Sequence, residues 1–94
     1  MEEREYYISL FDYYSKLLTQ KQREYFIDYY FENLTMEEIA ENDRVSKNAV
    51  SKQIISIKEK LDYYEENLNL YKNKLEIVNI LKDTKYLESV NKYI

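Results

Sequence analysis

A group of polar side chains at the start of one predicted helix has the chemistry to contact DNA. The group consists of Arg44, Ser46, Lys47, Asn48, Ser51 and Lys52. Asn can pair bidentately with adenine, Lys can donate to guanine, and Ser can contact a base or a phosphate. Ser46 is also a favourable N-cap, and the free N–H groups at a helix start suit a phosphate oxygen. These residue types at this spacing therefore predict the DNA-contacting face of a helix.

The elements that would position this face form a helix, a tight turn and a second helix within residues 35–54. Thr35 opens the first helix with a capping box, because Glu38 follows three residues later. Residues 42–44, Asn-Asp-Arg, are the strongest turn signal of the chain, and Val45 is expected to plug the turn as an apolar side chain. This order is the layout of a helix-turn-helix, whose second helix lies in the DNA major groove.

Charge is segregated along the chain in a way that favours the same segment. The 94 residues carry a net charge of −4, yet residues 44–60 contain five Lys or Arg against Glu59 alone. A basic segment on an acidic body fits a docking face that avoids indiscriminate binding, although a solvated helix face would look the same. Lys58 and Lys60 lie further along the helix and are expected to reach the DNA backbone at best.

The rest of the chain also reads as helix, so the predicted fold class is all-α. Apolar residues at helical spacing predict an amphipathic helix over about 3–17. Thr19 and Gln22 then form a second capping box, for a helix that runs to about Phe31. A short final helix is expected within 83–94. Residues 1–66 would form the helix-turn-helix domain, and residues 67–94 a tail that serves as a dimerisation element.

A heptad pattern continues from the second helix of the motif for about four repeats. It predicts a dimer seam made of Ile57, Leu61, Tyr64, Leu68, Tyr71, Leu75 and Val78. An unbroken helix over 47–81 would be roughly 50 Å long and would have to pair with another chain. The alternative is a helix that breaks, most readily near Asn67, Asn69 or Asn73, with the N-terminal helix covering the first half of the seam. Self-association is the favoured interpretation, and a homodimer is expected.

Composition argues against an enzyme and against a metal or cofactor site. Gly, Pro, Cys, His and Trp are all absent, which removes phosphate-binding Gly loops, zinc fingers, thiol nucleophiles and Ser-His triads. Lys47 and Ser51 share a helix face, but nothing nearby would lower the lysine pKa or stabilise an oxyanion. No catalytic residue, cofactor or metal is therefore expected. No apolar run is long enough to span a membrane, and a cytoplasmic location is expected.

Residues 17–54 resemble the fourth region of bacterial sigma factors, and the chain is more closely similar to the YlxM/p13 family. The similarity lies in LFDYY at 10–14, LTQKQR at 18–23, EIA at 38–40, VSKNAV at 45–50 and the LDYYEENL tail at 61–68. Asp43 departs from a general helix-turn-helix, where an apolar residue is usual. Arg44 departs too, because it stands where Gly usually takes a positive φ, which would cost Arg on the order of 1 kcal/mol or change the turn.

The resemblance implies a sigma-like helix-turn-helix and a link to the signal recognition particle pathway. Two functions follow as hypotheses. The first is a regulatory protein that binds double-stranded DNA. The second is a protein or RNA adaptor of the signal recognition particle that has kept the fold and lost DNA reading, which the net charge and the altered turn favour.

Overall fold

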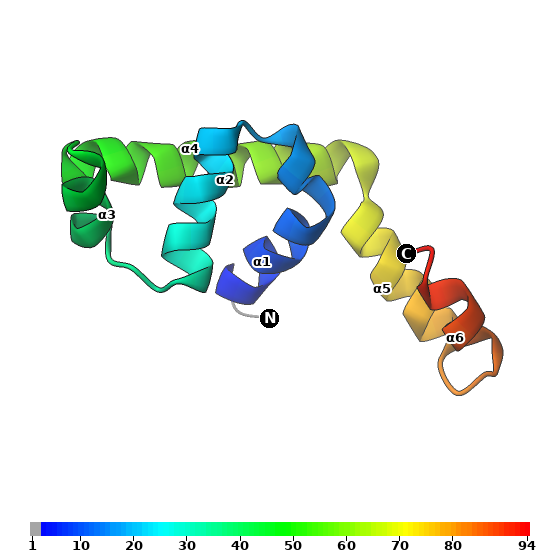
Figure 1. Cartoon of the computed structure of the whole chain (residues 1–94). Coiled ribbons are helices and arrows are strands. Elements are labelled where there is room, and N and C mark those ends of the chain that lie inside the picture. Colours follow the sequence, from blue (N-terminus) through cyan, green and yellow to red (C-terminus); the bar gives the residue numbers. More distant parts are fainter. Residues whose placement is uncertain (1–2) are drawn as a thin grey trace.

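The central element of the fold is α4 (Lys47–Leu68), a 22-residue helix that runs along the whole body of the molecule (Figure 1). The computed structural model describes residues 3–94, and the regular secondary structure of these residues is entirely helical. In chain order these are α1 (Glu3–Tyr14), η1 (Ser15–Leu17), α2 (Gln20–Phe26), η2 (Ile27–Phe31), α3 (Met36–Asp43), α4, α5 (Leu70–Leu81) and α6 (Tyr86–Asn91). The predicted all-α class is confirmed.

The core lies where α1, α2 and α3 pack against one side of α4. Its fully buried members are Leu10, Tyr14, Phe26, Ile39, Val50, Ile57 and Leu61. The Phe11 and Phe26 rings stack with their centroids 4.2 Å apart, which fixes α1 against α2. The first half of the heptad seam, at Ile57, Leu61 and Tyr64, is therefore covered by the chain's own N-terminal helices, as in the intramolecular alternative.

Side-chain caps start three of these helices, and all three were predicted. The Thr19 and Thr35 hydroxyls each accept a hydrogen bond from the backbone N–H of the third residue of their helix, and the side chains of Gln22 and Glu38 accept one from the backbone N–H of the cap residue. Ser46 accepts from the N–H of Ala49 at 3.0 Å. Each cap satisfies backbone donors that a helix start would leave unpaired.

The second helix extends to Phe31 as predicted, but its last five residues, η2, have π-helical hydrogen bonding. The Arg4 guanidinium of α1 donates to the carbonyl oxygens of Tyr29 and Tyr30 and to Asn33 Oδ1. It thereby satisfies acceptors that the end of this helix leaves free.

The long heptad-patterned helix breaks at Asn69, inside the region where a break was expected. Asn69 has a left-handed backbone with φ 55°, which Asn tolerates better than most residues. The break is held by the buried carboxylate of Glu65. It accepts hydrogen bonds from the Tyr14 hydroxyl at 2.6 Å and from the backbone N–H groups of Tyr71 at 3.1 Å and Lys72 at 2.8 Å. Glu65, near the end of α4, thus caps the start of α5.

The predicted dimer seam is divided by this break. Ile57 and Leu61 are buried against the N-terminal helices, Tyr64 is half-buried there, and Tyr71 packs beside Tyr6 and Tyr13. These residues belong to the chain's own core in this structure. Only Leu68 and Leu75 are exposed, while Val78 is half-buried.

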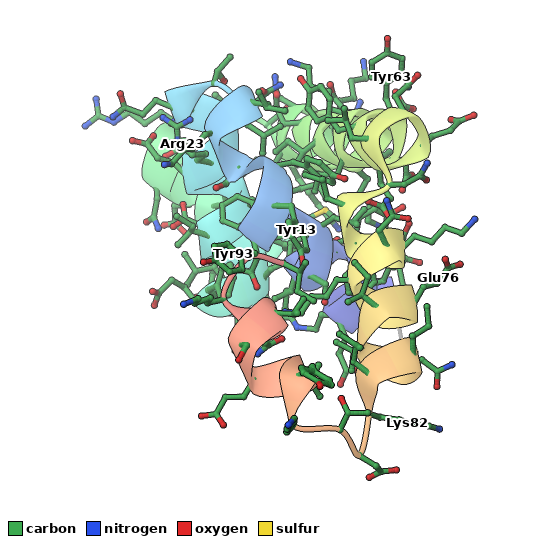
Figure 2. All side chains as sticks on the ribbon, turned by 90° about the vertical axis from the view of Figure 1, so that its right-hand side faces the viewer. Tyr13, Arg23, Tyr63, Glu76, Lys82 and Tyr93 are labelled. Atoms are coloured by element: carbon green, nitrogen blue, oxygen red, sulfur yellow. The ribbon has the colours of Figure 1, made fainter. Side chains whose placement is uncertain are left out.

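Helices α5 and α6 form a hairpin, here called the arm, that projects from the end of the body opposite α3 (Figure 1). The molecule measures 52 × 24 × 22 Å as a result. Tyr13 on α1 donates to the carbonyl oxygen of Ile94 at 3.3 Å, so the end of the chain returns to the body. In Figure 2 Glu76 and Lys82 of the arm point outward, and Tyr93 lies just beyond the end of α6.

Candidate nucleic-acid interface

Helix α3, the turn and the first half of α4 form a packed helix-turn-helix. Ile39 and Ala40 of α3 and Val50 of α4 are buried, and they supply the inner faces of the two helices. The N–H of Val45 donates to the carbonyl of Ala40 at 3.0 Å, which closes the turn. Arg44, at the C-terminal end of α3, takes the left-handed conformation with φ 57°. The turn therefore keeps the positive φ at the position where Gly is usual, despite the Arg side chain.

The other unusual turn residue, Asp43, is held by an ion pair. Its carboxylate lies 2.9 Å from the ammonium group of Lys21 on α2. This contact replaces the apolar packing that is more common there, and it ties the turn to α2. The prediction for Val45 was wrong: its side chain is 41% exposed, because Ile39 and Val50 already fill the space between the helices.

The structure brings the predicted DNA-contacting residues onto one end of the molecule. Arg44, Ser46, Lys47, Asn48 and Lys52 are exposed and Ser51 is half-exposed. Within residues 3–94, the side chains of Asn48 and Lys52 have no hydrogen-bond or ion-pair partner. The Ser46 hydroxyl serves α4 as its N-cap. The outer face of the first two turns is thus available to a ligand, because the inner face alone packs on the body.

Lys58 and Lys60 are placed differently from the other basic residues of α4. Lys58 contacts the Glu3 carboxylate and lies over the Tyr7 ring, 5.3 Å from its centroid. Lys60 donates to Gln22 Oε1 at 3.3 Å. Both amines face the N-terminal helices, so the structure does not bring them to the exposed face of Asn48 and Lys52.

One acidic side chain, which the sequence reading did not single out, enters this site. Glu37 in the first turn of α3 lies 2.8 Å from the ammonium group of Lys47, and both side chains are well exposed. The pKa of Glu37 is lowered and that of Lys47 is raised, in both cases mainly by their mutual hydrogen bond. The sequence did contain a signal for this ion pair, since Glu37 and Lys47 carry opposite charges and each lies in the first turn of one helix of the motif.

An open cavity of about 410 Å³ lies beside this ion pair. Its walls come from α1, the end of η2, the 33–35 loop and the starts of α3 and α4. The lining residues are Arg4, Tyr29, Asn33, Leu34, Thr35, Met36, Glu37 and Lys47. Arg4 and Lys47 outnumber the single carboxylate of Glu37, so the formal charge of the lining is positive.

The whole chain, residues 1–94, matches the model of a family described as "Putative helix-turn-helix protein, YlxM / p13 like". The chain belongs to the YlxM/p13-like family. A relative from Malacoplasma penetrans is 39% identical over 84 residues, covering 86% of this chain and 78% of its own. One from Ureaplasma urealyticum is 36% identical, covering 94% and 92%, and one from Geobacillus kaustophilus is 42% identical, covering 79% and 70%. All three are named only as members of the UPF0122 group.

Two further properties of this YlxM/p13-like chain bear on its chemistry. Between residues 3 and 94, no three side chains of His, Cys, Asp or Glu gather as a set of metal ligands. Within the same residues, no helix combines the length and the apolar character needed to cross a membrane.

Proposed function

We propose that this chain is a regulatory protein that binds double-stranded DNA, with the start of α4 in the major groove. The observation that carries the proposal is the exposed outer face of the first two turns of α4, on a helix-turn-helix whose inner face is packed. In this docking mode the first helix of the motif crosses the sugar-phosphate backbone and the second reads base edges.

Four residues of the site contact the DNA in this mode. Asn48 and Lys52 contact base edges, because their side chains have no partner among residues 3–94 and both belong to the first two turns of α4. Ser51 reaches a base or a phosphate. Arg44 at the turn lies outside the groove and contacts a phosphate. Lys58 and Lys60 are left out of the contact surface, since they are engaged with α1 and α2.

The test is fluorescence anisotropy with a random-sequence duplex over a salt titration. A random duplex offers Lys52 no fixed base pair, so its amine serves there as a phosphate contact, and Lys52→Gln should weaken binding and reduce the salt slope by about 0.9. Lys82→Gln is the matched control, because it removes the same charge from the arm. Selection of preferred duplexes with the wild-type protein and with Asn48→Ala should yield different sequences. If the wild-type protein binds no duplex at low salt, or if Lys52→Gln equals its control, the proposal fails.

The second candidate function is a non-catalytic adaptor of the signal recognition particle, acting on its protein or RNA. It is favoured by the acidic side chains of α3, which lie beside the exposed outer face of the first two turns of α4. Glu37, Glu38 and Glu41 are all exposed there and would repel a DNA backbone. An A-form RNA major groove is too narrow for a helix, so an RNA partner would use another face. Binding to the particle's RNA or proteins, with no binding to duplex DNA, is the outcome that selects this candidate.

We also propose that the tail, residues 67–94, joins two copies of the chain. The arm carries large apolar side chains in contact with water: Leu70, Leu75, Ile80, Tyr86 and Tyr93. Exposed apolar area of this kind is typical of protein interfaces. Sedimentation at micromolar concentration should show a dimer that Ile80→Ser weakens. Ile55→Ser, at an exposed position of α4, should leave the dimer intact. A strict monomer contradicts this proposal.

A further inference from the structure

We infer that Glu37 is a specificity-determining residue of the DNA site, because its carboxylate competes with DNA phosphates for Lys47. The inference rests on the DNA binding proposed above. It assigns to an acidic residue of α3 the task of suppressing non-specific binding by a basic residue of α4.

The geometry places the competitor at the right atom. Glu37 Oε1 lies 2.8 Å from Lys47 Nζ, and the two side chains are 64% and 61% exposed. The pair bridges the first turns of α3 and α4, and both residues line the cavity together with Arg4. A phosphate that approaches the start of α4 therefore meets a carboxylate already bound to the lysine it would contact.

The energetics allow this contact to be exchanged. An exposed ion pair contributes little to stability, so a duplex can displace Glu37 without disturbing the fold. The displaced carboxylate then stays near the phosphate backbone and repels it. An exposed Glu carboxylate is ionised at neutral pH even without the lysine beside it, so Glu37 keeps its negative charge after displacement.

This competition acts unequally on the two modes of DNA binding. Non-specific binding consists of phosphate contacts, so the withdrawal of one cation weakens it directly. Binding to a preferred site also draws on base contacts, for which the side chains of Asn48 and Lys52 are free, since neither has a partner in the described part of the chain. Lys47 can remain with Glu37 in that mode. Glu37 therefore raises the ratio of specific to non-specific affinity, which is how specificity is built by a repulsive element.

The experiment compares Glu37→Gln with Glu66→Gln. Both substitutions raise the net charge by one, and both side chains are exposed. Glu66 lies 19 residues further along the chain than Lys47, roughly 28 Å away along α4. Affinity for a random-sequence duplex is measured by anisotropy over a salt titration, together with affinity for the sequence selected by the wild-type protein. Circular dichroism checks that each variant is folded.

Glu37→Gln should bind the random duplex about fivefold more tightly than Glu66→Gln at about 0.15 M salt, since one added phosphate contact with a slope of about 0.9 contributes roughly that factor relative to 1 M salt. Its salt slope should rise by about 0.9, and its preference for the selected sequence should fall. In a Lys47→Gln background the same substitution should lose most of its effect.

Equal binding by the two variants, or weaker binding by Glu37→Gln, overturns the role of Glu37 while the proposed function stands. An unchanged or higher preference for the selected sequence overturns it as well. The absence of duplex binding by the wild-type protein and by Glu37→Gln is a different result, because it removes the proposed DNA-binding function itself.

Discussion

Removal of a single oxygen atom from Tyr14 should loosen the join between α4 and α5. The Tyr14 side chain is only 1% exposed, and its hydroxyl makes two hydrogen bonds. It donates to Glu65 Oε1 at 2.6 Å and accepts from the N–H of Leu70 at 3.1 Å. Tyr14→Phe keeps the ring in the core and deletes both bonds, so the change isolates the polar contribution of this residue.

The expected loss of stability follows from the two bonds. A hydrogen bond to a charged group contributes about 1.5–3 kcal/mol, and a buried donor left unpaired costs about 1 kcal/mol or more. The sum is about 3 kcal/mol, a large share of the roughly 5–15 kcal/mol that stabilises a domain. For a domain of this size, it corresponds to a melting temperature lower by about 12–24 °C.

Thermal and urea unfolding followed by circular dichroism measure this loss. The control is Tyr63→Phe, because Tyr63 is 62% exposed and points away from the body near the end of α4 (Figure 2). Its free energy of unfolding should stay within about 0.5 kcal/mol of the wild type. If Tyr14→Phe proves as stable as this control, the Glu65 carboxylate does not depend on the hydroxyl and the argument for the join is refuted.

Three other measurements test the same structure. Arg44→Gly should raise the free energy of unfolding by about 0.5–1 kcal/mol, because a non-Gly residue with φ 57° is strained, and lower stability would contradict this account of the turn. Ser46→Ala should cost about 1 kcal/mol by removing the cap of α4, whereas Ser89→Ala on the exposed face of α6 should change little. Burial and the hydrogen bond to Glu65 raise the pKa of Tyr14 from 10.0 to about 12, so its contribution to stability is complete below pH 10 and is lost as the pH rises toward 12. Urea midpoints between pH 8 and 12 should show this fall, and a fall of equal size in Tyr14→Phe would assign it to other groups.

Local chemistry explains why the helix starts and the break were predictable from sequence. A capping box such as Thr35 with Glu38 involves residues three positions apart, so the pattern contains all the interacting groups. The break at Asn69 also depends on a local property, the tolerance of Asn for a left-handed backbone. The same holds for the helix-turn-helix itself, whose spacing of polar and apolar residues spans only 20 positions.

What the sequence did not reveal depends on residues far apart in the chain. The burial of Glu65 requires Tyr14, 51 positions earlier, and the start of the next helix. A weak signal existed, because Glu65 falls on the same face of α4 as Leu61. The Glu37–Lys47 pair likewise depends on how two helices cross. The exposure of Val45 depends on its neighbours Ile39 and Val50, which occupy the space between the helices.

The uninterrupted length of α4 also sets the scale of any DNA site read by two copies of the chain. Its 22 residues span about 33 Å and separate the proposed DNA-contacting face at one end from the arm at the other. In a two-fold dimer joined through the arms, two collinear copies of α4 alone would separate the DNA-contacting faces by about 66 Å, which approaches two turns of B-DNA and not one. The length of α4 would then set the spacing of the two half-sites. A selection should therefore include inverted half-sites spaced by two turns.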